Sequence, residues 1–142
     1  MATTVNNTTV NSRVTIIFDA GGPLDGNGPA KGTGNTESDV YIDSKVYFNI
    51  RSHTEIDANI HALQWDATTN TGELEYIGSR ENESLSSFPQ WATNVVIRCE
   101  AQDAWQTAYE GHADANAEDD SAAVTVADTA RTNYLTAHNI TY

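Results

Sequence analysis

The side chains best suited to binding a metal ion lie in a short acidic stretch in the last third of the chain. Oxygen-bearing residues alternate there, at Asp114, Asn116, Glu118 and Asp120. A calcium-binding loop that began at the first of these would need glycine at its sixth position and glutamate at its twelfth, and this chain has Asp119 and Thr125 there. The pattern excludes an EF-hand and leaves only a weak, salt-dependent cation site.

A glycine-rich segment, Gly26 to Thr33, has the composition of a phosphate-binding loop. A Walker loop requires Gly-Lys-Thr in that order, whereas this chain has Lys31-Gly32-Thr33. We also expect a strand after the segment, and not a helix whose N-terminus could hold a phosphate. The sequence therefore does not support nucleotide binding.

Residues that could support catalysis are present, but they do not form a recognisable motif. No two of the four histidines have the spacing of metal ligands, and neither HExxH nor GxSxG occurs. The lone cysteine, Cys99, follows the apolar run Val95–Ile97, where we expect a buried and inert thiol. Glu73 and Glu75 are best interpreted as exposed acidic residues. We therefore predict that the protein is not an enzyme and has no cofactor.

The charge balance excludes further classes of partner. The chain has 142 residues, with 20 acidic and 7 basic ones, and a net charge of −13. Such a chain repels phosphate, so neither nucleic-acid binding nor attachment to an anionic membrane is expected. Scattered acidic residues with only two lysines resemble the composition of proteins from salt-loving organisms, and an ordinary acidic protein is the alternative.

The start of the chain, MATTVNNTTVN, has neither the basic nor the apolar region of a signal peptide. No apolar run approaches the roughly 20 residues of a membrane span. We expect synthesis in the cytoplasm without a signal peptide and without a membrane partner.

The element with the clearest pattern is a β-hairpin from Ile60 to Gly78. Apolar and polar residues alternate in both arms, around Leu63 and Trp65 and around Leu74 and Tyr76. The arms flank a run of turn-forming residues that ends in Gly72.

Further strands follow from the same alternation and from β-branched residues. One is expected from Arg13 to Asp19, and either one bent strand or two short ones from Asp39 to Arg51, with the bend at Asp43–Lys45. In this segment, Val46, Phe48 and Ile50 should share one face, with Tyr47 and Asn49 on the other. Strands are also predicted over 94–101 and 122–127, and over 54–60, where a helix is the alternative.

Two segments of the last third fit either type of element. Residues 103–112 fit a helix or a strand. Asp128 can cap a short helix that runs to Leu135, and a strand is the alternative. We predict a mainly β fold, an antiparallel β-sandwich or barrel-like domain, with one or two short helices in this part.

The domain organisation is an N-terminal arm followed by one domain. Residues 1–12 are rich in threonine and asparagine, so we expect a flexible arm, either disordered or added to a neighbouring subunit's sheet. Residues 13–142 form a single β-rich domain, in which 20–38 is a long loop rich in glycine and proline.

Phe88 and Trp91 flank Pro89 and either cap the core of the sheet or contact a partner. In an assembled protein the candidate oligomer contacts are the apolar residues of the arm, the loop and this aromatic pair: Val5, Val10, Leu24, Phe88 and Trp91.

The arm, the long loop and the β-rich body with few large aliphatic residues resemble the organisation of small virion proteins of tailed viruses, and the composition would suit a halophilic host. This resemblance implies a tail-tube or neck subunit, with homo-oligomeric rings, other virion proteins as partners and DNA only as passing cargo. The alternatives are a head decoration protein and a carbohydrate-binding β-sandwich that uses Trp65, Trp91 and Trp105.

Overall fold

The computed structural model describes residues 3–5, 8–10, 13–18, 34–57, 59–77, 80–112 and 121–141. The chain divides into two compact units, Met1–Val96 and Ile97–Tyr142. The boundary falls inside the helix α1 (Gln90–His112). Because the two units share one helix, the predicted single domain over residues 13–142 stays a prediction.

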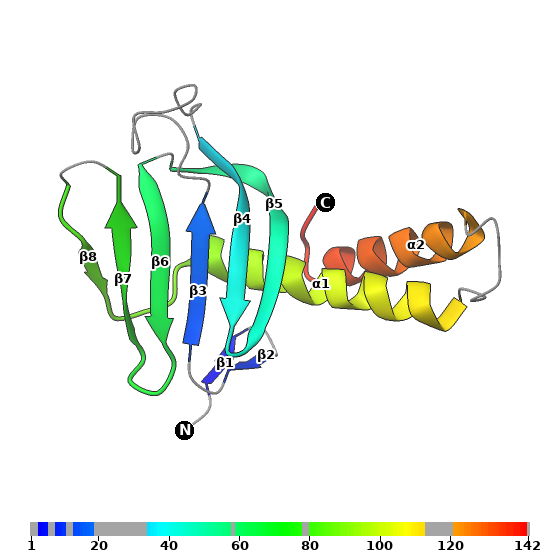
Figure 1. Cartoon of the computed structure of the whole chain (residues 1–142), viewed down its shortest axis with the longest axis horizontal. Helices are drawn as coiled ribbons and strands as arrows, with labels where there is room; N and C mark the ends of the chain where they lie inside the picture. Colours follow the sequence, from blue (N-terminus) through cyan, green and yellow to red (C-terminus); the bar gives the residue numbers. More distant parts are fainter. Residues whose placement is uncertain are drawn as a thin grey trace. The chain divides into compact units, whose positions relative to one another are not determined.

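The main element of the first unit is a six-stranded antiparallel sheet (Figure 1). Its order is β5-β4-β3-β6-β7-β8, so β5 and β8 form its two edges. The strands are β3 (Arg13–Phe18), β4 (Gly34–Ile42), β5 (Lys45–Asp57), β6 (Ile60–Asp66), β7 (Thr71–Tyr76) and β8 (Glu83–Leu85). The prediction of a mainly β chain with helices in its last third is confirmed, and the sandwich or barrel-like closure stays a prediction.

Two short strands precede the sheet. β1 (Thr3–Val5) and β2 (Thr8–Val10) pair antiparallel with each other. The proposed arm therefore contains a two-stranded sheet of its own, and its addition to a neighbouring subunit stays a prediction.

The strand predicted from Arg13 and the hairpin predicted from Ile60 form where they were expected. In β3, Val14, Ile16 and Phe18 are buried and alternate with more exposed residues. β6 and β7 form the predicted hairpin, in which Leu63 lies opposite Leu74. The predicted bend at Asp43 is a tight turn, and the Asp43 side chain accepts a hydrogen bond from the backbone of Arg13 (3.1 Å).

The prediction that Val46, Phe48 and Ile50 share one face of β5 is wrong, because the strand contains a bulge. Asn49 has a φ of 55°, in the left-handed region, and its backbone N–H donates to the Asp39 side chain (3.0 Å). The register with β4 shifts at this point, which breaks the period-two alternation. Ile50 is therefore buried, whereas Val46 and Phe48 are exposed.

β4 begins earlier than expected, at Gly34, so residues 34–38 belong to a strand and not to the predicted loop. The side chain of Asn35 fixes this segment in the sheet. Its buried side-chain amide donates to the carbonyl oxygens of Asp57 (2.9 Å) and Ile60 (2.8 Å), which connects β4 to the turn between β5 and β6. The rest of the predicted loop lies outside the described residues.

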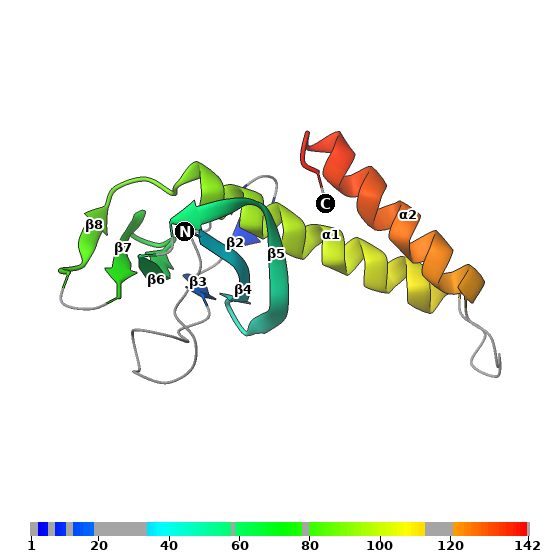
Figure 2. The same cartoon turned by 90° about the horizontal axis from the view of Figure 1, so that it is seen from above.

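Aromatic side chains cover the buried face of the sheet, across which the first turns of α1 lie (Figure 2). Trp65 packs edge to face against Phe88, with ring centroids 5.4 Å apart, and Phe18 packs against Trp91 at 5.7 Å. Phe88 and Trp91 therefore take the core-capping role that was one of their two interpretations.

The strand predicted over 94–101 is wrong, because these residues lie within α1. The helix starts directly after Pro89, whose carbonyl oxygen accepts hydrogen bonds from Ala92 and Thr93. A short apolar run does not separate a buried strand from a buried helix. The buried residues Ala92, Val95, Val96 and Cys99 do have helical spacing, and this is the signal that favoured a helix.

The strand predicted over 122–127 is also wrong, because α2 (Ser121–Ala137) covers it. Ala123 and Ala127 are buried one turn apart, whereas Val124 and Val126 are exposed. Asp128 lies inside this helix and does not cap it. Both ambiguous segments are helical, and the helices have 23 and 17 residues, so they are not short.

The second unit packs the later turns of α1 against α2. Ile97, Ala101 and Leu135 form a buried cluster that Tyr134 and Ile140 cover. Arg98 is buried and donates to the carbonyl oxygen of Thr141. Asn139 follows α2 and has its φ, 58°, in the left-handed region, which ends the helix.

Replacing each of two glycines by alanine should change the free energy of unfolding in opposite directions. A Cβ at Gly72 would press against the Gln64 carbonyl and lie 2.8 Å from Cε3 of Trp65, whereas a Cβ at Gly111 would meet no atom within 4 Å. We expect Gly72→Ala to lower the free energy of unfolding by about 1–3 kcal/mol. Gly111→Ala should raise it by up to about 1 kcal/mol, because glycine disfavours a helix. Urea denaturation followed by circular dichroism measures both, and an unchanged Gly72→Ala variant would contradict the packing described.

Candidate functional site

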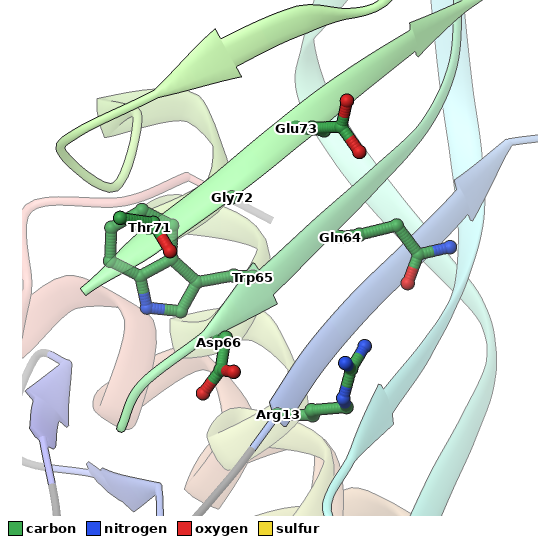
Figure 3. A pocket seen from close by; sticks show the side chains of 7 residues that line it. All are labelled: Arg13, Gln64, Trp65, Asp66, Thr71, Gly72 and Glu73. Carbon is green, nitrogen blue, oxygen red and sulfur yellow. The ribbon is translucent and has the colours of Figure 1, made fainter. Parts of the chain in front are cut away.

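The face of the six-stranded sheet opposite the first turns of α1, here called the outer face, carries the candidate site. A polar depression of about 210 Å³ opens on it, at the end of the β6–β7 hairpin. Its lining residues come from β3, β6 and β7: Arg13, Gln64, Trp65, Asp66, Thr71, Gly72 and Glu73. Figure 3 shows the Gln64 and Glu73 side chains above the strands, with the Trp65 ring turned away from Gln64.

Strand register places the polar side chains of the depression side by side. Gln64 lies between Thr15 and Glu73 on neighbouring strands, and Asp66 lies between Arg13 and Thr71. The Thr15 hydroxyl donates to the side-chain oxygen of Gln64 (2.9 Å), which orients that amide.

Asp66 has a structural role at the hairpin turn. It accepts hydrogen bonds from the Thr68 hydroxyl (2.6 Å) and the Thr68 backbone N–H (2.9 Å). These bonds, with a smaller contribution from Arg13, lower the pKa of the Asp66 carboxyl below its ordinary value. Asp66 therefore stays ionised near neutral pH and is unsuited to act as a general acid.

The chemistry of the polar depression is that of hydrogen bonding and weak charge pairing. Its lining contains one guanidinium and two carboxylates, and neither a histidine nor a cysteine lies in it. The lining therefore offers neither a Ser–His nor a Cys–His pair.

An apolar patch occupies the outer face on the side of β5. It consists of Tyr41, Val46 and Phe48, all of which are exposed, and Phe48 is 63% exposed. Tyr41 and Val46 are direct cross-strand partners. Large apolar side chains that gather on a surface are typical of a contact site for another protein. This apolar patch is the part of the outer face that is suited to binding a partner.

The apolar patch was not among the predicted contact residues. The prediction placed Val46 and Phe48 on one face with Ile50, so nothing distinguished them from core residues. The bulge at Asn49 separates them, and an asparagine within an apolar run is the only local signal for it, since asparagine tolerates the left-handed region.

The structure places some of the predicted oligomer-contact residues, whereas the other contact residues and the predicted cation ligands lie outside its described side chains. Phe88 and Trp91 pack against Trp65 and Phe18 within the first unit. Val5 and Val10 lie in β1 and β2, and their side chains are outside the described part of the chain, as is Leu24. The cation candidates also lie outside the described residues: Asp114, Asn116, Glu118 and Asp120. Elsewhere in the described ranges no three metal-ligating residues gather.

The second unit contains a separate polar cluster. The Tyr134 hydroxyl donates to the Glu100 carboxylate (2.9 Å), and the Tyr134 ring packs on His138 with centroids 4.6 Å apart. Burial raises the pKa of Glu100, against the opposing effect of the Tyr134 hydrogen bond. Burial, and then the hydrogen bond to Glu100, raise the pKa of Tyr134 to about 12. The cluster keeps Tyr134 protonated as a donor, which is a structural role.

Comparisons with protein-family models, with curated proteins and with solved structures find no match. In the described part of the chain, neither helix combines the length and apolar character that crossing a bilayer requires.

The Tyr134 hydroxyl makes stability depend on pH above 10. Its folded pKa of about 12 exceeds the ordinary value of 10.0, so the stability it contributes is complete below pH 10 and is lost as the pH rises toward 12. We expect the free energy of unfolding to fall over this range, and less steeply in Tyr134→Phe. Urea denaturation at several pH values measures the slope. Equal slopes in the wild-type and Tyr134→Phe proteins would contradict the assignment.

Proposed function

We propose that this chain is a structural, self-assembling virion protein, a tail-tube or neck subunit that forms homo-oligomeric rings. The observation that carries the proposal is the edge strand β5, which has 13 residues and lies beside the apolar patch of Tyr41, Val46 and Phe48. A long edge strand next to exposed apolar side chains promotes association with another chain. In an assembled protein, this edge would pair with a strand of a neighbouring copy.

The nature of the outer face further supports assembly over catalysis. Its described side chains provide hydrogen bonds and apolar contact, and the polar depression has neither a Ser–His nor a Cys–His pair. A ring in which the sheets of neighbouring copies join would also supply the barrel-like closure expected from the sequence.

The net charge of −13 suits the proposed role in a DNA conduit. Acidic walls repel the phosphates of passing DNA, so the DNA moves without being bound. The proposed partners are therefore other copies of this chain and other virion proteins, with DNA as cargo only and with no membrane. A halophilic host would supply the salt that screens repulsion between such acidic copies.

The carbohydrate-binding alternative receives less support, because the tryptophans are engaged elsewhere. Trp65 is only 3% exposed, and Trp91 packs on Phe18. Trp105 stacks on Tyr109 with the ring planes 6° apart, and its N–H donates to Asp128 (2.8 Å). A sugar-binding platform needs aromatic faces that are open to the ligand.

The proposal predicts that purified protein assembles, and that Phe48 is needed for it. Light scattering and negative-stain microscopy should show rings or tubes, more abundant at molar salt because salt screens the repulsion between copies. Phe48→Ser should raise the concentration for half-assembly by about tenfold or more, as loss of an aromatic contact at an interface does. Val126→Ser, which removes an exposed apolar side chain from α2, is the matched control.

Three outcomes separate the candidate functions. A strict monomer at molar salt and high concentration would contradict the assembly proposal. Small closed oligomers that never stack would favour the head decoration alternative. Equal losses in the Phe48 and Val126 variants would remove the apolar patch from the assembly contact.

A further inference from the structure

The charges around the apolar patch are nearly balanced, although the chain as a whole is strongly acidic, with 20 acidic and 7 basic residues. The segment from residue 36 to residue 54, which carries the patch, contains three carboxylates and two basic side chains. They are Glu37, Asp39, Asp43, Lys45 and Arg51. Glu55 and Asp57 follow at the far end of β5, where Asp57 pairs with Gly34. The patch therefore lies in a part of the chain with little net charge.

These charges have neighbours within the same copy. Two carboxylates accept hydrogen bonds from backbone N–H groups, and one basic side chain lies opposite a carboxylate in the register of β4 and β5. The pairs are Asp39 with Asn49 (3.0 Å), Asp43 with Arg13 (3.1 Å) and Arg51 with Glu37. The Lys45 ammonium lies over the Tyr47 ring, 5.1 Å from its centroid. A strongly charged partner therefore gains little at the patch, which suits an apolar surface without excess charge.

The surface next to the patch is polar and uncharged. Tyr41 lies between Val46 on β5 and Thr15 on β3. Thr15 in turn lies beside Gln64 on β6, and its hydroxyl donates to the Gln64 side-chain oxygen (2.9 Å). An apolar centre with a hydrogen-bonding rim is the usual anatomy of a protein–protein interface. This row of side chains thus has the composition of a surface that packs on another protein.

The side of the outer face near β7 is acidic. Glu73 and Glu75 are cross-strand partners of β6 there, and Asp66 lies at the end of β6. A basic partner would be attracted to this side and not to the patch. Two copies that overlapped fully would bring these carboxylates together, so the charges favour contact between copies only at the patch. The patch of a second copy is itself apolar with little net charge, which is what the first patch requires of a partner.

We propose that two copies of this chain pack face to face across a two-fold axis, with the apolar patch of each against that of the other. Such a contact is isologous, the commonest kind in homo-oligomers. The sheet of one copy then covers part of the outer face of the other, so the pair has the two sheet layers of a β-sandwich. The inference rests on the proposed self-assembly and specifies which surfaces meet. It uses the face of the sheet and leaves the backbone of the β5 edge for pairing along the edge.

Single cysteines and a short bis-maleimide cross-linker test the two-fold contact. A residue at the centre of an isologous patch meets its own counterpart, and packed sheets lie about 10 Å apart, which allows cross-linking. Tyr41→Cys and Val46→Cys should each give covalent dimers. The reaction is carried out at a protein and salt concentration where sedimentation velocity shows the variant to be associated.

Glu73→Cys is the matched control on the same face. It lies on β7, three strands away from Tyr41 on β4, so it should run as a monomer on denaturing gels after the same treatment. The native Cys99 is buried, and the wild-type protein should therefore give no cross-linked species.

The position of Tyr41 distinguishes the face contact from pairing of two β5 edges. Because Tyr41 lies on β4, its two copies in an edge-to-edge pair would be at least three strand spacings apart, about 14 Å, which is beyond the reach of the short reagent. A cross-link at Val46 without one at Tyr41 would therefore indicate edge pairing and would overturn the inference.

The outcomes separate this inference from the proposed function. If the Tyr41 cross-link forms but the wild type makes neither rings nor tubes, the two-fold contact stands and the tail-tube or neck proposal fails. If the wild type makes rings and neither patch cysteine cross-links, the two-fold contact is overturned and self-assembly stands. Equal cross-linking of Glu73→Cys would show contacts without a preferred surface and would also overturn the inference. A wild type that stays monomeric at molar salt would overturn both.

Discussion

The packing of Trp65 is the interaction on which the first unit depends. Its ring crosses Gly72 on the neighbouring strand and meets Phe88 edge to face, so one side chain joins β6, β7 and the segment that leads into α1. Only glycine fits beneath the ring. These aromatic residues fill the buried face, and the outer face carries the polar side chains of the depression and the exposed apolar patch. The surface available to a partner follows from how the core is filled.

The bulge at Asn49 decides which apolar residues of β5 are exposed. A regular strand would bury Val46, Phe48 and Ile50 together. The left-handed residue changes the alternation, so that Ile50 enters the core and Phe48 is exposed. Full burial of a phenylalanine side chain gains about 1.5–3 kcal/mol, and Phe48, which is 63% exposed, obtains only part of this stabilisation in the monomer. A contact with another chain can obtain it, which is why the bulge and the edge position of β5 together favour assembly.

Local patterns predicted the parts of the fold that depend on local chemistry. The β6–β7 hairpin and the turn at Asp43 follow from alternation and from turn-forming residues, which act over a few positions. The helices over 94–101 and 122–127 were missed, because β-branched residues favour strands and a short apolar run fits either element. The candidate site could not be predicted. It depends on β3 lying between β4 and β6, and this order follows from contacts between residues far apart in the chain.

The proposed ring depends on a balance between overall charge and hydrophobic contact. Copies with a net charge of −13 repel one another, and at about 0.1 M salt this repulsion is largely screened beyond about 10 Å. The hydrophobic contact of the apolar patch is not weakened by this screening. Salt therefore favours association through the apolar patch, because the burial of Tyr41, Val46 and Phe48 does not depend on charge and the repulsion that keeps copies apart is reduced.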